Sequence, residues 1–183
     1  MTTHKKLPSL DLVRKIIKYD PNTGVLTWLH RDDDMFQKGK RTNNEIANVW
    51  NARNANKPAG NFNGRYIIVR FYGIHYAAHR LAWLLYYEVD PEFQIDHIDG
   101  NKTNNKISNL REATKSENMM NRGAQKNSKS GIKGIMFEEK RGKWKAEITL
   151  NRKNYFLGRF YDLDEAIHAR KEAEKIYHGD FAK

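Results

Sequence analysis

Hydrophobic residues recur at helical spacing near the N-terminus, where they predict a helix over residues 9–19 with one buried face. The stretch "DPNTG" that follows is rich in turn-forming residues, and "VLTW" has the β-branched and aromatic composition of a strand. From His30 to about Lys57 the chain is polar and shows no period, so we expect a loop or a surface excursion there.

The middle of the chain changes from extended to helical spacing. The segment "GRYIIVRFYGIHY", which ends at Tyr76, is rich in β-branched and aromatic residues, and Gly73 marks a hairpin turn within it. Residues 77–87 then have the spacing of a well-buried helix. Another short strand is predicted over residues 93–97, and the "DGN" that follows predicts a turn.

Two later helices have capping boxes, in which a small polar residue and a glutamate three positions on satisfy each other's backbone donors. Thr114 and Glu117 predict a helix from about Lys115, and Asp162 and Glu165 predict the last helix of the chain. The apolar stripe of this last helix should lie against a sheet, and its members are Ala166, Ala169, Ala173 and Ile176.

The polar run "RGAQKNSKSG", residues 122–131, has no apolar anchors and predicts a linker. We therefore expect an N-terminal domain over residues 1–121, with a core motif at 93–121, and a C-terminal domain over residues 132–183. The second domain should be a three-stranded antiparallel sheet with one helix. A chain of 183 residues is long enough for two small domains, and the predicted fold class is α+β.

The composition adds a strong positive field to this picture. The formal net charge is +11, and 39% of the residues are hydrophobic, which suffices for a packed core. We expect nucleic acid as the polyanion, because no basic amphipathic helix or long apolar run suggests a membrane. A basic protein whose charge only keeps it soluble is the alternative. The absence of cysteine excludes disulfides and thiolate zinc sites.

The stretch "IDHIDGNKTNNKISNLREATKSENMMN", residues 95–121, places one histidine among many small amide side chains. Hydrolysis of a phosphodiester needs a group that takes a proton from water and a cation that absorbs charge on the leaving oxygen. The neutral imidazole of His97 suits the first role. The oxygens of Asp96 and Asn118 suit a divalent cation with open positions. Asn109 can hold its own loop against the strand of His97.

Three other asparagines are interpreted as turn and cap residues, namely Asn101, Asn104 and Asn105. Because neighbouring residues of a strand face opposite ways, Asp96 and His97 can serve one phosphate only under certain conditions. Either the strand ends or twists there, or the substrate lies between them. We expect His79 to pack in the interior, and Arg80 is a candidate phosphate contact.

This stretch resembles the HNH endonuclease motif on the ββα-metal fold, in the form found in phage and intron-encoded homing endonucleases. The "HRLAW" helix at residues 79–83 is also typical of that group. The resemblance implies that His97 is the general base and that Asn109 orients it. It also implies that Asp96 and Asn118 bind the metal. Asn118 stands where many members carry histidine, so the implied site is all oxygen and favours one Mg²⁺ ion, with Mn²⁺ as the alternative.

The implied activity is site-specific cleavage of double-stranded DNA, as in phage homing endonucleases, without a small-molecule cofactor. Two rivals stay open. A DNA-binding regulator with a relic nuclease fold would bind DNA without cutting it, and a structure-directed or RNA-directed nuclease would cut other phosphodiesters. We expect a cytoplasmic protein, because the N-terminal "MTTHKKLPSLDLVRKII" lacks the pattern of a signal peptide. A monomer is expected, with a homodimer as the open alternative.

The second strand of the C-terminal domain alternates between an apolar face and a charged face. Trp144, Ala146, Ile148 and Leu150 should pack on the last helix, so the other face is free to enter a major groove. On or near that face lie the candidate DNA-binding residues Lys133, Lys140, Arg141, Lys143, Lys145, Glu147, Arg152 and Phe156.

This domain resembles the plant ethylene-response-factor DNA-binding domain through "IKGI", "GKWKAEI", "FLGRF" and "DLDEAIHAR", and the resemblance covers nearly all of residues 131–181. The resemblance places Lys133 at a DNA-contacting arginine, Glu147 at a strand-two glutamate and Phe156 at a tryptophan contact. Met136 and Thr149 replace arginines of that family, so its base preferences do not carry over.

Overall fold

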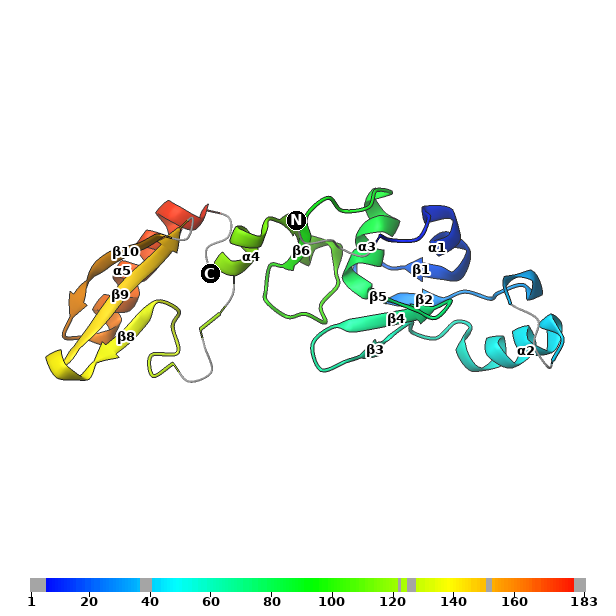
Figure 1. Ribbon diagram of the computed structural model, residues 1–183, viewed down its shortest axis with the longest axis horizontal. Helices are drawn as coiled ribbons and strands as arrows, with labels where there is room; N and C mark the ends of the chain where they lie inside the picture. The colour runs from blue at the N-terminus through cyan, green and yellow to red at the C-terminus, as the bar shows by residue number, and fades with distance from the viewer. Residues whose placement is uncertain (1–5, 37–40, 122, 125–127, 151–152, 180–183) are drawn as a thin grey trace. The chain divides into compact units, whose positions relative to one another are not determined.

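The computed structural model describes residues 6–36, 41–121, 123–124, 128–150 and 153–179 (Figure 1). The chain divides into two compact units, residues 1–112 and 113–183. This division falls before the predicted boundary at residue 121, and residues 122 and 125–127 of the predicted linker lie outside the described residues. The predicted domain limits therefore stay a prediction.

The first unit contains short helices and small antiparallel sheets. Its elements are α1 (Leu10–Ile16), β1 (Ile17–Tyr19), β2 (Leu26–Trp28), η1 (Asp33–Met35), α2 (Asn43–Asn54), β3 (Asn61–Phe62), β4 (Ile67–Phe71), β5 (Ile74–Ala77), α3 (Ala78–Tyr87), β6 (Gln94–His97), η2 (Ile107–Asn109) and most of β7 (Leu110–Ala113). The sheets are β1–β2, β3–β4–β5 and β6–β7. The predicted mixture of helices and strands is present.

The predicted N-terminal helix ends earlier than expected. Ser9 caps α1 through a hydrogen bond from the Leu12 backbone N–H, but the helix stops at Ile16. Ile17 to Tyr19 instead pair with Leu26 to Trp28 as an antiparallel hairpin. Ile17 is β-branched and suits a strand better than a helix. Pairing with the neighbouring strand therefore outweighs the helical spacing of the sequence here.

The loop expected between His30 and Lys57 contains a helix, so this prediction was wrong for residues 43–54. Thr42 and Glu45 form a reciprocal capping box at the start of α2. Ala47 is the one fully buried residue of this helix, so its sequence carries almost no hydrophobic period. Figure 1 shows α2 at the edge of its unit, where little of it faces the core.

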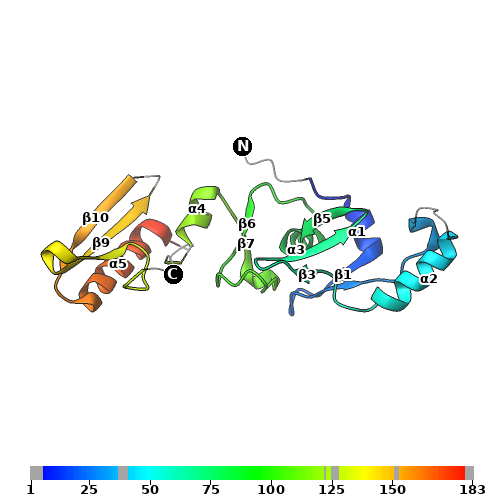
Figure 2. The ribbon, with the colours of Figure 1, turned by 60° about the horizontal axis from the view of Figure 1, so that its bottom comes forward.

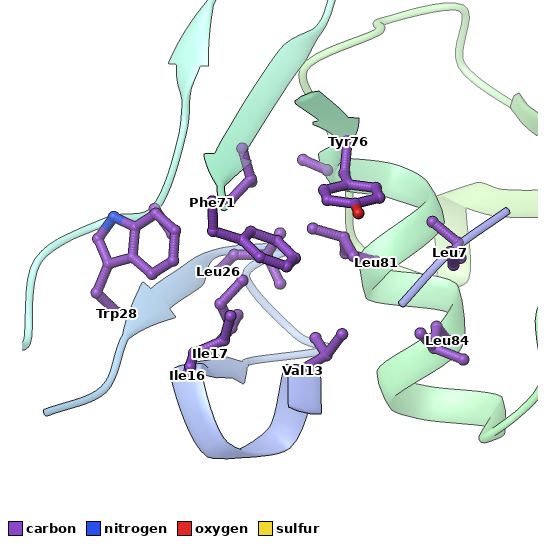
Figure 3. Packing of buried hydrophobic residues seen from close by; sticks show 13 residues of the cluster. Leu7, Val13, Ile16, Ile17, Leu26, Trp28, Phe71, Tyr76, Leu81 and Leu84 are labelled. Atoms are coloured by element: carbon purple, nitrogen blue, oxygen red, sulfur yellow. The ribbon is translucent and has the colours of Figure 1, made fainter. Parts of the chain in front are cut away.

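The core of the first unit lies between α1, α3 and the β4–β5 hairpin. Figure 3 shows side chains from these elements pointing toward one another, among them Val13, Ile16, Phe71 and Leu81. The hairpin turn at Gly73 has φ +72°, and α3 begins at Ala78, both close to the prediction. Ile95 of the strand that carries His97 packs in a separate small cluster with Ala82 and Leu110.

The second unit contains α4 (Lys115–Met120), β8 (Ile135–Glu138), η3 (Glu139–Arg141), β9 (Lys143–Leu150), β10 (Lys153–Phe160) and α5 (Leu163–His178). The strands form an antiparallel sheet in the order β10–β9–β8. Helix α5 lies along one face of this sheet (Figure 1, Figure 2). Ala146 and Ala166 are fully buried between them.

The predicted apolar stripe of α5 needs one correction. Ile176 is 73% exposed, whereas Arg170 is only 1% exposed and faces the sheet. The Arg170 guanidinium donates to the Lys133 carbonyl at 2.9 Å and pairs with Glu174 at 3.0 Å. Gly134 leaves room for it, because a Cβ there would lie 2.9 Å from Arg170 Nε. The buried side of α5 thus includes a long polar side chain that the pattern did not predict.

Candidate functional site

His97 is the last residue of β6 and is 4% exposed. Strand β6 pairs with β7, and beyond its end the Ile98 N–H donates to the Asn109 carbonyl at 2.9 Å. Burial lowers the pKa of the His97 imidazole below its ordinary value of 6.5, although a hydrogen bond with Asn105 and the charge of Asp96 oppose this. The ring is therefore neutral near pH 7.

Asp96, the predicted metal ligand beside it, is 5% exposed. Its Oδ2 accepts from Arg111 Nε at 3.1 Å and lies 3.0 Å from Arg111 Nη2. Arg111 belongs to the neighbouring strand β7 and was not recognised in the sequence. Asp96 and His97 thus contact different neighbours, as expected for adjacent residues of a strand.

Asn109 braces the loop between β6 and β7, as predicted. Its Oδ1 accepts from the Asp99 N–H at 3.0 Å, and its Nδ2 donates to Asp99 Oδ1 at 3.0 Å and to the Asn104 carbonyl at 2.8 Å. These bonds close the loop at both ends. The predicted role of Asn109 in orienting the base stays a prediction.

Asn105 has a different place from the turn role that the sequence suggested. It is 2% exposed, and its Oδ1 lies 3.1 Å from His97 Nε2. The neighbouring Asn104 instead donates from its side chain to Asp99 at 2.7 Å. Neighbouring residues of an extended segment face opposite ways, so one of two adjacent asparagines is expected to face the interior. The pair Asn104–Asn105 is the signal in the sequence that could have revealed this contact.

Two aromatic rings lie near the imidazole, and two cations lie beside one of these rings. The His79 ring lies 5.1 Å from the His97 ring at 81°, and the Tyr66 ring lies 6.3 Å from it. His79 is 8% exposed, so its predicted packing role is confirmed. The exposed Lys102 and Arg65 lie 5.4 and 5.2 Å from the Tyr66 ring. Sequence reasoning missed both cations, because Tyr66 and His97 are far apart along the chain.

Arg80, the candidate phosphate contact, is only 9% exposed. Its Nη2 donates to Asp90 Oδ1 at 2.7 Å and to the Pro91 carbonyl at 3.3 Å, and its Nη1 donates to the Phe93 carbonyl at 3.4 Å. The guanidinium therefore holds the segment that leads into β6. This interior setting does not favour a contact with DNA.

Asn118, the other predicted metal ligand, lies on α4. The capping box between Thr114 and Glu117 is formed in both directions, so the predicted start of this helix is confirmed. Asp96 belongs to the first unit and Asn118 to the second, so their joint role at one ion stays a prediction.

The described residues contain no group of three or more histidine, cysteine, aspartate or glutamate side chains that could hold a metal ion. A carboxylate and an amide oxygen nevertheless suit Mg²⁺, which takes few protein ligands and fills its other positions with water and phosphate oxygens. The chemistry of the predicted donor set therefore fits the predicted ion.

The sheet face opposite α5 gathers charged and aromatic side chains from all three strands. The register pairs Lys145 with Met136 and Arg159, and Glu147 with Phe156. Lys145 and Glu147 form an ion pair at 2.5 Å, and Phe156 is 56% exposed. We call the residues Met136, Glu138, Lys143, Lys145, Glu147, Phe156 and Arg159 the open face of the sheet.

Arg159 joins the open face because β10 contains an irregularity. The register shifts between Phe156 and Gly158, so Leu157 is an extra residue relative to β9. Phe156 and Arg159, three positions apart, thereby come to one face, and the Arg159 guanidinium lies 4.9 Å from the Phe156 ring. Strict alternation along the strand separates these two residues, which is why Arg159 was not a candidate.

The remaining predicted DNA contacts fall in different places. Lys133, which was predicted to lie near this face, donates from its ammonium to the Met119 and Met120 carbonyls at the end of α4, and its contact with DNA stays a prediction. Lys140 and Arg141 are exposed in η3, next to the sheet. Arg152 lies outside the described residues.

Comparisons with known proteins bear on the first unit. The family described as HNH endonuclease matches residues 76–120. Protein 3.8 of Escherichia phage T7 is 35% identical over 91 residues, which cover 50% of this chain and 74% of that protein. No solved structure matches the chain. The family match spans β6, η2, β7 and α4, and it includes His97 and Asp96.

Proposed function

The chain belongs to the family of protein 3.8 of phage T7 and contains an HNH endonuclease domain at residues 76–120, and on this premise we propose that it is a site-specific, metal-dependent DNA endonuclease of the homing type. The observation that carries the proposal is the setting of His97. A buried histidine with a lowered pKa, inside the matched residues and held by Asn105, suits a general base.

In the proposed reaction, neutral His97 takes a proton from a water that attacks the phosphorus of the DNA backbone. Its low pKa keeps the ring unprotonated at neutral pH, so the base is ready before the substrate arrives. A divalent cation held by Asp96 and Asn118 would supply positive charge for the leaving 3′-oxygen. Arg111 holds Asp96 by one carboxylate oxygen and so fixes the direction of the carboxylate.

Two groups of cations support a DNA substrate. Lys102 and Arg65 lie beside Tyr66, next to the imidazole, where they can meet phosphates that flank the cleaved bond. The second group is on the open face of the sheet, which α5 leaves uncovered. We propose that this face binds the duplex in the manner of the ethylene-response-factor domain. Contact with about five phosphates gives a log-log salt slope of about −4 to −5.

The test is cleavage of phage genomic DNA by the full chain in Mg²⁺, followed by mapping of the cut ends by sequencing. His97→Ala should slow cleavage by about 10²–10⁴-fold, because general base catalysis contributes about this much. His75→Ala is the matched control, since His75 is an exposed histidine of β5 in the same unit. Cleavage by His97→Ala at the wild-type rate would refute the proposal. Tight binding without cleavage by any variant would favour the non-catalytic regulator.

A further inference from the structure

We propose that Asn105 is a positioning residue that fixes both the tautomer and the orientation of His97. Its consequence for catalysis rests on the proposed nuclease function, whereas its effect on the imidazole rests on geometry alone. Asn105 would thus act within the site, although its sequence context suggested only a turn residue.

The contact between the two side chains determines which ring nitrogen carries the proton. Asn105 Oδ1 lies 3.1 Å from His97 Nε2, and both residues are almost fully buried. An amide oxygen can only accept a hydrogen bond, so Nε2 must be the donor. In the neutral ring the lone pair then lies on Nδ1. This nitrogen is therefore the one that receives the proton of the attacking water.

The backbone of Asn105 is held by the β1–β2 hairpin. The Tyr19 hydroxyl donates to the Asn105 carbonyl at 2.7 Å. The Ile107 N–H donates to the Pro21 carbonyl at 3.1 Å, in the turn of the same hairpin. Burial is the main reason that the pKa of the Tyr19 hydroxyl is raised, so this donor keeps its proton.

Gly24 brings the hairpin turn directly against the peptide after Asn105. A Cβ at this position would lie 2.5 Å from both Asn105 C and Lys106 N, so only glycine permits the approach. The hairpin, residues 17–28, lies outside the matched residues 76–120. A segment remote from the motif thus supports the loop that holds the base.

The other neighbours of His97 limit how its ring can turn. His79 meets it edge to face at 5.1 Å, and Tyr66 lies 6.3 Å away at 32°. His79 and Tyr66 lie beside the imidazole, and Asn105 lies at Nε2. A rotated imidazole would therefore lose the hydrogen bond to Asn105 inside a buried site. Losing a buried hydrogen bond is unfavourable, so the observed orientation is the stable one.

The first measurement is the tautomer of His97 in the full chain, by long-range ¹H–¹⁵N correlation spectra without metal, with the signals assigned through His97→Gln. At a pH where the ring is neutral, the wild-type chain should show Nε2–H alone. Asn105→Ala should give a mixture of tautomers, and Asn105→Asp, which keeps an oxygen acceptor, should keep Nε2–H. A wild-type ring protonated at Nδ1 would overturn the proposal. The wild-type spectrum is decisive even if the alanine variant does not fold.

The second measurement is single-turnover cleavage at saturating DNA. Groups that orient a functional residue contribute about 10–100-fold, so Asn105→Ala should lose about this factor in rate with its DNA affinity unchanged. Asn105→Asp adds a negative charge that raises the pKa of His97, so it should stay within a few fold of wild type when both chains are assayed at a pH where the ring is neutral. Tyr19→Phe should show a smaller loss. Asn101→Ala is the matched control, since Asn101 is an exposed amide of the same loop that bonds Thr103.

The two measurements separate the two hypotheses. If the wild-type chain does not cleave DNA, the proposed function fails, while the tautomer spectra still report on Asn105. If the wild-type chain cleaves and Asn105→Ala cleaves equally fast with an unchanged His97 spectrum, then Asn105 has no positioning role.

Discussion

Replacing Gly24 by alanine tests the support that the β1–β2 hairpin gives to the histidine loop. Gly24 has φ +77°, and an alanine in this left-handed region is disfavoured by about 1–2 kcal/mol. The new Cβ would also lie 2.5 Å from two backbone atoms, where ordinary contacts are 3.4–4 Å. Forced overpacking of this kind costs about 1–3 kcal/mol. Gly24→Ala should therefore lower the free energy of unfolding by about 2–5 kcal/mol.

The matched control is Gly73→Ala. Gly73 has nearly the same φ, +72°, but a Cβ at this position would have no atom of the described residues within 4 Å apart from its own chain neighbours. Gly73→Ala should lower the free energy of unfolding only by the cost of the left-handed backbone conformation, about 1–2 kcal/mol. Urea unfolding followed by tryptophan fluorescence measures both variants. Cleavage should fall for Gly24→Ala and stay at wild type for Gly73→Ala under conditions where both are folded. Equal destabilisation of the two variants would refute the steric argument.

Three further outcomes follow from other contacts. Arg80→Ala should lower the free energy of unfolding by about 2 kcal/mol, because the charged hydrogen bond between Arg80 and Asp90 is lost, without changing the salt dependence of DNA binding; a changed slope with unchanged stability would return Arg80 to the DNA interface. Arg65→Ala with Lys102→Ala should reduce the magnitude of the log-log salt slope by about 2, measured by fluorescence anisotropy; an unchanged slope would exclude the pair from the DNA contact. Burial lowers the pKa of His178 below 6.5, so its neutral form stabilises the second unit above that pH and this contribution is lost as pH falls below it. Thermal unfolding between about pH 5 and about pH 7 should show this slope in wild type and a smaller one in His178→Gln, and equal slopes would contradict the assignment.

Periodic patterns predicted the elements that bury a clear face. The β4–β5 hairpin and α3 were predicted almost to the residue, because their apolar residues meet one core. Helix α2 was missed since Ala47 is its one fully buried residue. Its capping box at Thr42 and Glu45 was present in the sequence but had no period to support it. Ile176 was wrongly assigned to the buried stripe and Arg170 was missed, because the space beside Gly134, which accepts a guanidinium, cannot be seen in a pattern.

The candidate site likewise contains residues that local spacing predicted and residues that it did not. The motif reading predicted that His97 and Asp96 lie together at the end of a strand and that Asn109 closes the loop, since local spacing specifies all three. Arg111 and Asn105 were missed as partners, because which of several similar side chains faces the interior depends on the register and on a hairpin elsewhere in the chain. The bulge in β10 hid Arg159 for a similar reason.

The hairpin contact also bears on protein engineering with this chain. A nuclease cassette cut at the limits of the recognisable motif, residues 76–120, would leave behind Tyr19 and Gly24. Such a graft would carry every residue of the motif and still lack the scaffold that seats its asparagine loop. A transplantable version must therefore begin upstream of residue 17, and chimeras of related phage proteins should exchange the hairpin and the motif together.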